Sequence, residues 1–568
     1  MQIYSFRTKC HNARSKKRAL AGGSEVVFYV KNRYLYCGGP RGPDIEKQLA
    51  RMRYDRLLLP LTLPLAGAAA QQASAQAAAA AGRPNIILFM VDDMGWQDTS
   101  LPFWSERTFY NDRYETPNME RLARQGVMFT QAYACSLSSP TRCSLMTGSN
   151  AARHRVTNWT LRKGVTTDAA DDRLAFPEWN CNGIAQSEGT DLTYVGTSFV
   201  DLLRADGYHT IHCGKAHWGA IDTPGENPHH FGFEVNIAGH AAGGPATYLS
   251  ERNYGYDADG RPQGLFAIPG LEKYWQSGTF LTEALTREAI AAMEKAVRYD
   301  RPFYLYMSHY AIHVPIDRDM RYYEKYLHKG LSAKEAAYAS LIEGMDKSLG
   351  DIMDWLERSG EADNTVIIFM SDNGGFCSST GWRDEPLYTQ NYPLTCGKGS
   401  AYEGGIREPM IVSWPGVTAA GTRCDSYVMI EDFFPTILEM AGIERWKVPQ
   451  TVDGVSFVPL LTGRGDPSRG RCLYWNFPNK WDGGDGPGVA PTATVRCDNW
   501  KMIYFYEDGH KELYDIPNDI SEKHDLAAGH PDVVRRLSKR LGEFLRHSGG
   551  QRPTFKDSGQ PCPWPDEI

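Results

Sequence analysis

The sequence has few cysteines, and none of them stand in the spacing of a metal site. Only 12 of its 568 residues are cysteine, and no two of these are separated by two residues. A Cys-x-x-Cys zinc site or redox motif is therefore disfavoured. The sequence leaves open whether Cys377 and Cys396 form a disulfide or remain buried thiols.

Long apolar segments are also missing. The run over residues 57–70 is short and is interrupted by Pro60 and Pro64, so we expect no transmembrane anchor. Basic residues precede this run and Ala73-Ser74-Ala75 follows it, a pattern that predicts a signal peptide over residues 52–75. We therefore expect a periplasmic or secreted protein, and we interpret residues 1–51 as a mis-annotated N-terminal extension.

The chain lacks an excess of basic residues. Lys and Arg total 61 against 68 Asp and Glu, and without residues 1–75 the totals are 48 and 64, a net charge of −16. This balance argues against nucleic acid as a partner. A mature chain this acidic must bind any anionic ligand through local cations or a metal.

The length of the chain and its apolar segments predict an α/β protein of two domains. Continuous apolar runs at 84–91, 208–213, 302–307 and 365–370 are typical of parallel strands that are buried on both faces. Short aromatic strands at 472–477, 492–497, 501–506 and 512–515, followed by a helix at 531–546, predict a small antiparallel sheet with a packed helix. We place the domains at 83–442 and 443–568, and the second shows no obvious chemistry.

Polar residues follow the apolar runs, where open α/β sheets bind their ligands. They are Asp92 and Asp93, Lys215 and His217, His313, and Asp372 and Asn373, and Lys398 stands in a glycine-rich loop. Taken singly, the Asp pair also fits a capped turn and Lys398 a solvated loop. We expect the long loop over residues 222–270 to shape a pocket beside them.

One stretch connects these residues to a reaction. Ser138-Ser139-Pro140-Thr141-Arg142 is closed by Thr147-Gly148, and we expect a helix that starts near Thr141. Ser138 would then lie just before a helix N-terminus, which favours anions, and Arg142 would point back towards it. Taken alone, five residues also fit a serine-rich helix start without chemistry.

This run resembles the signature of the type I, formylglycine-dependent sulfatases of the alkaline phosphatase superfamily, in the Ser-type form of bacterial polysaccharide sulfatases. The resemblance extends from about residue 83 to the final helix; Met146 and Ala216 depart from the usual pattern. It implies a large, alkaline-phosphatase-like, mixed and mostly parallel sheet flanked by helices, plus a small C-terminal antiparallel sheet with a packed helix. It also implies a formylglycine made from Ser138 by a radical S-adenosylmethionine maturase, and one Ca²⁺ held by oxygens of Asp92, Asp93, Ser138, Asp372 and Asn373.

The implied activity is hydrolysis of a carbohydrate sulfate, which we expect to be a galactose or N-acetylgalactosamine sulfate of a glycan. Lys215 and Lys398 would neutralise the sulfuryl oxygens, and Arg142 would orient residue 138. His313 would protonate the leaving alcohol, and His217 would take the proton whose loss expels sulfate. Two alternatives are a phosphate or phosphonate ester hydrolase that uses unmodified Ser138, and a non-catalytic binder of sulfated glycans. The oligomeric state stays open.

Overall fold

The computed structural model describes residues 29–30, 33–34, 83–376, 381–384, 389–484 and 486–568. The chain divides into two compact units, Met1–Ala69 and Ala70–Ile568. In the first unit, β1 (Tyr29–Val30) pairs with β2 (Arg33–Tyr34) in antiparallel fashion. The predicted signal peptide and the rest of the predicted extension lie outside the described residues.

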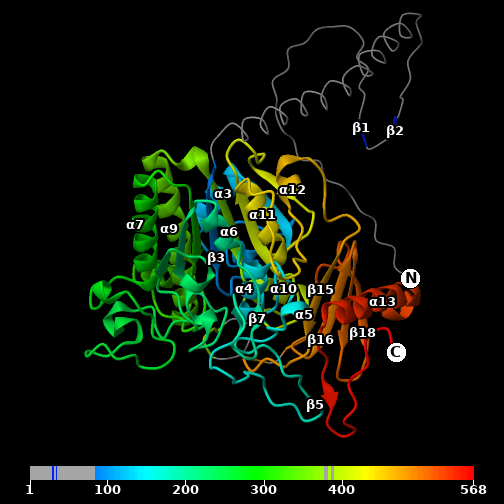
Figure 1. Cartoon of the computed structure of the whole chain (residues 1–568). Coiled ribbons are helices and arrows are strands. Elements are labelled where there is room, and N and C mark those ends of the chain that lie inside the picture. Colours follow the sequence, from blue (N-terminus) through cyan, green and yellow to red (C-terminus); the bar gives the residue numbers. More distant parts are fainter. Residues whose placement is uncertain (1–28, 31–32, 35–82, 377–380, 385–388, 485) are drawn as a thin grey trace, which may run out of the picture. The chain divides into compact units, whose positions relative to one another are not determined.

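The second unit is built on a nine-stranded sheet (Figure 1). Its strand order is β13-β4-β12-β11-β3-β10-β8-β9, with β14 also paired to β4. Every pairing in this sheet is parallel except those that β12 makes with β11 and β4. The strands are β3 (Asn85–Val91), β4 (Val127–Tyr133), β8 (His209–Gly214), β9 (Val235–Ile237), β10 (Phe303–Ser308), β11 (Thr365–Ser371), β12 (Arg407–Ser413), β13 (Thr422–Cys424) and β14 (Val428–Met429).

Helices cover both faces of this sheet (Figure 1), which explains why its strands are apolar throughout rather than alternating. In β3, for example, Phe89 packs into one apolar cluster and Leu88 into the other. One face is covered by α3 (Pro117–Gln125), α7 (Leu281–Arg298), α8 (Tyr323–His328) and α9 (Ala333–Ser359). The other is covered by α4 (Ser138–Thr147), α6 (Phe199–Ala205), α11 (Phe433–Met440) and α12 (Val458–Thr462).

The long helix α9 begins and ends at residues suited to those positions. Ser332 caps it, because its hydroxyl accepts a hydrogen bond from the backbone N–H of Glu335 at 3.3 Å. Gly360 ends it at a φ of 80°, a conformation that glycine adopts without strain. The Glu335 carboxylate binds Arg383 at 2.7 Å.

A second, four-stranded antiparallel sheet follows in the chain, in the order β15-β16-β17-β18. The strands are β15 (Cys472–Phe477), β16 (Thr492–Cys497), β17 (Trp500–Phe505) and β18 (Lys511–Asp515). The helix α13 (Pro531–Ser548) packs Leu537, Leu541 and Leu545 into the apolar cluster of this sheet. With both sheets as predicted, the fold class is confirmed.

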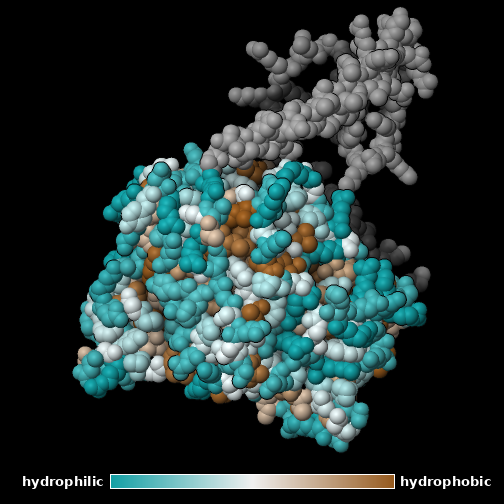
Figure 2. Space-filling view, in the orientation of Figure 1, coloured by the Kyte–Doolittle hydropathy of each residue, from teal (hydrophilic) through white to brown (hydrophobic). Residues whose placement is uncertain are grey.

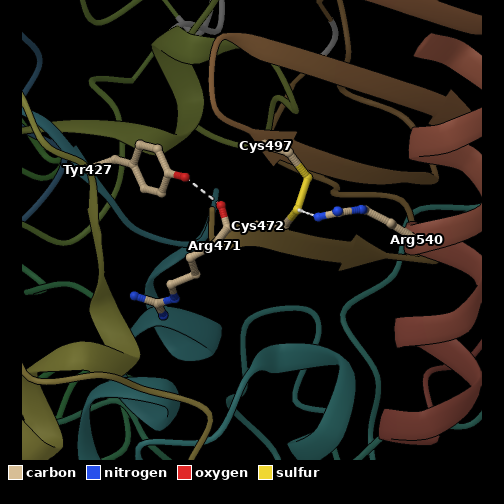
Figure 3. Close-up of a disulfide and its surroundings, with 5 residues drawn as sticks. All are labelled: Tyr427, Arg471, Cys472, Cys497 and Arg540. Atoms are coloured by element: carbon tan, nitrogen blue, oxygen red, sulfur yellow. Dashed lines mark hydrogen bonds between the residues drawn. A yellow bond between two sulfur atoms is a disulfide. The ribbon is translucent and has the colours of Figure 1, made fainter. Parts of the chain in front are cut away.

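A disulfide joins the first two strands of the small sheet (Figure 3). Cys472 and Cys497 are register partners of β15 and β16, and Arg540 of α13 donates a hydrogen bond to the Cys472 sulfur at 3.0 Å. The sequence did not predict this pair, because it does not give the strand register. Cys377, whose pairing with Cys396 the sequence leaves open, lies outside the described residues.

Buried polar contacts fix the small sheet against the large one. The Trp475 indole donates to the Ala134 carbonyl at 2.7 Å. Lys501 of β17 is fully buried and pairs with Glu403 at 3.0 Å and with Glu522 at 2.8 Å. Glu403 begins the short helix α10 (Glu403–Ile406), five residues after Lys398. The two sheets are therefore joined close to a predicted site residue.

Shorter elements connect these parts. They are α2 (Phe109–Arg113), α5 (Ala151–His154), β5 (Leu174–Ala175), β6 (Ile184–Ala185), β7 (Tyr194–Val195) and β19 (Thr554–Phe555), which pairs with β5. On the face shown in Figure 2, hydrophilic residues cover most of the surface, with some apolar residues gathered near α11 and α12. Among the described helices, none has both the length and the hydrophobicity of a membrane span.

Candidate active site

The sheet brings the predicted polar residues to one edge. The strands β11, β3, β10 and β8 are parallel neighbours, so their carboxyl ends lie side by side. Asp92 and Asp93 follow β3, Asp372 and Asn373 follow β11, Lys215 follows β8, and His313 lies five residues beyond β10. All of them except His313 are almost fully buried. The strand topology therefore accounts for their meeting.

Ser138 meets them from the first turn of α4. The helix begins at Ser138, three residues earlier than predicted, and Leu137 is the residue before it. Pro140 is tolerated because it lies in the first turn, where its missing N–H has no partner to lose. Thr141 does not cap the helix; its hydroxyl accepts a hydrogen bond from the Cys135 N–H at 3.0 Å. The helix N-terminus thus points at the carboxyl edge of the sheet.

Lys215 and Asn373 hold the Ser138 hydroxyl. The Lys215 ammonium donates to Ser138 Oγ at 2.9 Å and to both oxygens of Asp92 at 2.8 Å. Ser138 Oγ donates to Asn373 Oδ1 at 3.0 Å. Burial raises the pKa of Asp92 and Lys215 partly offsets it, while burial lowers the pKa of Lys215. The hydroxyl is therefore held between a cation and the oxygens of two neighbouring strands.

Arg142 holds Asp372. Its Nε and one terminal nitrogen donate to Asp372 Oδ2 at 3.0 and 2.9 Å, and the other terminal nitrogen contacts Ser308 and Tyr306. Burial opposes ionisation of Asp372, but Arg142 and Lys215 outweigh it and keep the pKa well below its usual value. The terminal nitrogen that contacts Ser308 also donates to the Lys215 carbonyl at 3.2 Å, so Arg142 connects residues at the carboxyl ends of β8, β10 and β11.

Asp93 lies between Lys398 and His313. Lys398 donates to Asp93 Oδ1 at 2.6 Å, and His313 Nε2 lies 3.6 Å from Oδ2. Burial raises the pKa of Asp93, but Lys398 and His313 outweigh it and lower the pKa overall. Burial and Lys398 lower the pKa of His313 to about 3. Since His313 Nδ1 lies 2.8 Å from the Val314 carbonyl, that nitrogen carries the proton of the neutral ring.

The carboxylates also form a candidate metal centre. Asp92, Asp93 and His313 each offer one ligand atom, and these atoms lie within 4.8 Å of one another. Asp93 Oδ2 is buried and accepts no hydrogen bond from the residues that the structure describes. The sequence placed no imidazole among the metal ligands, whereas the structure places His313 beside Asp93.

His217 has one nitrogen committed and one available. Its Nε2 donates to the Thr160 carbonyl at 3.0 Å, and its Nδ1 is buried without a partner in the described part of the chain. Burial and then Lys215 lower the pKa of His217 well below its usual value, so the ring is neutral. His309 directly follows β10, much as Asp92 follows β3, but it packs against Phe89 and contacts Ser348, so it is a core residue.

The loop over residues 222–270 closes over the two site histidines, as expected. Glycines make this approach possible, since a Cβ on Gly243 would lie 2.3 Å from His217 Cε1 and one on Gly244 would lie 2.8 Å from His313 Nδ1. Gly243 and Phe266 of this loop line the same pocket as Ser138. Close backbone contact therefore fixes both imidazoles.

The pocket has a volume of about 250 Å³, and the sequence analysis missed most of its walls. Ser138, Lys215, His217, His313 and Lys398 form its floor. Its walls are aromatic, formed by Trp159, Phe266, Phe376, Trp382 and Trp481, with Asp482 at one side. These aromatic residues lie in irregular segments without a recognisable pattern, so no signal in the sequence brings them together.

The C-terminal region, which showed no obvious chemistry in the sequence, contributes Trp481 and Asp482 to the lining of the pocket. Its loops reach the pocket because the small sheet is fixed against the large one. The segment 382–384 contributes only Trp382, since Arg383 is turned away, paired with Glu335 at 2.7 Å and stacked over Tyr338.

The fold and the floor of the pocket define a class, the alkaline-phosphatase-like α/β hydrolases, in which a nucleophile, carboxylates and cations meet at the carboxyl edge of the sheet. The chain belongs to the sulfatase family: the family model "Sulfatase" matches residues 84–443. A second model, "N-sulphoglucosamine sulphohydrolase, C-terminal", matches residues 396–547. The protein is therefore a sulfuric ester hydrolase, as the resemblance predicted.

Individual relatives of the chain are also sulfatases by name. A sulfatase of Formosa agariphila is 30% identical over 545 residues, covering 85% of this chain and 92% of its own. The human N-acetylgalactosamine-6-sulfatase is 29% identical over 500 residues, covering 82% and 85%. Among solved structures, Ps i-CgsB superposes with a TM-score of 0.65 at 27% identity, covering 82% of this chain and 93% of its own. That protein has also been solved in complex with k-i-k-neocarrahexaose.

Proposed function

We propose that the protein removes O-sulfate from a carbohydrate, using a formylglycine at position 138 and one calcium ion. The observation that carries this proposal is the pocket floor, where Ser138 Oγ lies 2.9 Å from Lys215 and 3.0 Å from Asn373. A sulfate ester needs cations around its oxygens and a nucleophile within reach, and both are present on this floor.

The donors fit a calcium ion. Calcium prefers carboxylate and amide oxygens, and Asp92, Asp93, Asp372 and Asn373 supply them at the ends of two neighbouring strands. Asp93 Oδ2, buried without a hydrogen bond among the described residues, is such a donor. A bound calcium ion would neutralise the sulfuryl oxygens and make the oxygen at position 138 more acidic. Arg142, which pairs with Asp372 at 2.9 Å, would orient that carboxylate for such an ion.

The chain's own cations bind the sulfate group. Lys215 and Lys398 both line the pocket and both stand beside carboxylates, which keep them charged. They are preorganised for the charge that grows in the transition state. Formylglycine, once hydrated, supplies an oxygen nucleophile together with a second hydroxyl, which an unmodified serine lacks.

The two pocket histidines move the protons. His217 is neutral with Nδ1 available, so it can take the proton whose loss releases sulfate. His313 has a low pKa beside Lys398, but an anionic ester in the pocket stabilises its imidazolium and raises that pKa. His313 then protonates the leaving sugar oxygen. His313 Nδ1–H, held by the Val314 carbonyl, fixes the direction of the ring.

The substrate that we propose is a galactose or N-acetylgalactosamine sulfate within a glycan. Support comes from the relatives named N-acetylgalactosamine-6-sulfatase and from the oligosaccharide complex of Ps i-CgsB. The aromatic walls also suit the apolar faces of sugar rings. We further propose maturation by a radical S-adenosylmethionine enzyme and action in the periplasm or outside the cell.

Mass spectrometry of residue 138 tests this proposal. The chain is produced with and without the maturase, and the peptide that contains residue 138 is analysed. We expect a mass lower by two hydrogens than serine predicts, reactivity with an aldehyde reagent, and hydrolysis of sulfated sugars only in the modified sample. Ser138→Ala abolishes turnover, and Ser139→Ala, a buried neighbour whose hydroxyl contacts Thr160, keeps the modification.

The alternatives give other results. Hydrolysis of phosphate or phosphonate esters by a chain that retains serine at position 138, without sulfatase activity, would replace our proposal by the phosphoesterase alternative. Binding of sulfated glycans without turnover in the modified chain would indicate a non-catalytic homologue.

A further inference from the structure

One part of the pocket lining differs in chemistry from the cationic floor. Among the described residues that line the pocket, Asp482 is the sole carboxylate, and it stands beside Trp159 and Trp481. The floor attracts an anion, whereas this wall offers two indole rings and one negative charge. A ligand that fits both must be anionic at one end only.

Trp159 fixes the position of Asp482. The Trp159 indole N–H donates to Asp482 Oδ1 at 2.9 Å. This bond does not use Oδ2, the second carboxylate oxygen of Asp482. Trp159 is itself held, because the adjacent Thr160 receives the His217 ring on its carbonyl and contacts the Ser139 hydroxyl through its N–H at 3.1 Å. The position of Trp159 is therefore fixed relative to His217 and to the residue next to Ser138.

The other indole reaches the sulfate-binding floor. The Lys398 ammonium lies 5.9 Å from the centre of the Trp481 ring, within the range of a cation–π contact. Gly399 allows this approach, since a Cβ there would lie 2.4 Å from Trp481 Cε3. Phe376 packs edge-on against Trp481 with ring centres 6.1 Å apart. A sulfate bound by Lys398 would therefore lie near the Trp481 ring.

Buried hydrogen bonds tie the two wall segments together. Asp168 accepts from Asn158, next to Trp159, at 2.8 Å, and from Asn479, near Trp481, at 3.2 Å. Thr157 donates to Asn479 at 2.6 Å. The wall is thus a rigid, preformed structure rather than two independent loops.

We propose that Trp159, Trp481 and Asp482 form a subsite that selects a sugar carrying a single negative charge, its sulfate ester. The indole rings stack on the apolar face of the ring, and Asp482 accepts a hydrogen bond from a hydroxyl of the same sugar. A second sulfate or a carboxylate on that side meets Asp482 and is repelled. This inference rests on the proposed function, because it assigns the sulfate to the floor of the same pocket.

A binding measurement tests the subsite without turnover. Calorimetry on the full chain with unmodified Ser138 compares N-acetylgalactosamine 6-sulfate with the 4,6-disulfate. We expect the monosulfated sugar to bind about tenfold more tightly. Asp482→Asn brings the two dissociation constants to within about threefold, mainly by improving the disulfated sugar. Trp159→Phe keeps a ring but frees Asp482, and lowers the discrimination as well.

Asp557→Asn serves as the matched control, because Asp557 is exposed and does not line the pocket. We expect Asp557→Asn to keep the tenfold preference for the monosulfated sugar. Equal affinities of the wild-type chain for both sugars, or an unchanged preference in Asp482→Asn, would overturn the subsite. Because the unmodified chain is used, failure of the hydrolysis assay on the matured chain counts against the proposed function alone.

Discussion

At the scale of single residues, the two pocket histidines differ in what surrounds them. His313 lies beside a carboxylate and a lysine, with Nε2 3.6 Å from Asp93 Oδ2, whereas His217 lies against a backbone carbonyl. Both rings are neutral in the free protein, because burial lowers both pKa values. Only His313 has an acidic neighbour that favours protonation. This difference supports His313 as the acid and His217 as the base.

The role of His313 predicts a dependence on the leaving group. His313→Ala should lower kcat/KM for a sugar sulfate by about 10²–10⁴-fold, because an alkoxide leaves poorly without a proton. The loss on an aryl sulfate should stay below about tenfold, since a phenolate leaves unaided. Steady-state kinetics on both substrates gives the comparison. Equal losses on both would mean that His313 binds the sulfate rather than protonates the leaving group.

The catalytic floor was largely predictable from the sequence, and the walls were not. Asp92, Lys215 and Asp372 follow buried strands, so one rule about sheet edges brings them together. Trp481 and Asp482 lie between β15 and β16 in a segment without periodicity, and only the packing of the two sheets puts them beside Ser138. The start of α4 at Ser138 was also missed, because a proline in a first turn is compatible with several helix starts.

At the scale of elements, the loop that carries Gly243 and Gly244 acts as a backbone clamp on the imidazoles. Gly243 has no positive φ, so alanine is allowed there by the backbone and the only conflict is steric. At these two positions the backbone, rather than a side chain, contacts the rings of His217 and His313. The positions of the two imidazole rings thus depend on two glycines, which have no functional group of their own.

Gly243→Ala should therefore displace His217 while leaving the fold intact. A new Cβ would lie 2.3 Å from the ring, which must shift by about 1 Å, and such a shift costs about 10²-fold in kcat. The matched control is Gly529→Ala, where nothing lies within 4 Å of the added Cβ. Turnover and thermal unfolding of both variants provide the test. An unchanged kcat in Gly243→Ala would show that His217 need not stand where it does.

At the scale of the whole molecule, neutral histidines in the core make stability depend on pH. His154, His212 and His309 are buried, and burial lowers the pKa of each to about 3. His154 receives the Val156 N–H on Nδ1 at 3.0 Å and contacts the Ser144 hydroxyl through Nε2 at 3.0 Å. Protonation would disrupt such contacts, so these rings stay neutral in the folded state.

The sign of the effect follows from the two states. In the unfolded chain a histidine binds a proton below about pH 6.5, whereas in the folded chain these three do so only near pH 3. The unfolded state is therefore favoured as the pH falls from 6.5. Each ring contributes a loss of about 1.4 kcal/mol per pH unit to the free energy of unfolding, which is fully regained above pH 6.5.

Urea unfolding between pH 7.5 and 5 should show this slope. His154→Asn keeps an acceptor for Val156 and should reduce the slope by about 1.4 kcal/mol per pH unit. His547→Gln, on the exposed side of α13, should leave the slope as it is. If both variants kept the full slope, His154 would not be one of the groups responsible.

The origin of the pocket wall has a consequence for how such enzymes diversify. The residues proposed to act on the ester follow strands of the large sheet or lie in the segments between them, whereas Trp481 and Asp482 come from a segment some 80 residues beyond Lys398. If the proposed subsite is right, substitutions in that distant segment would change the preferred sugar and leave the residues that follow the strands of the large sheet as they are.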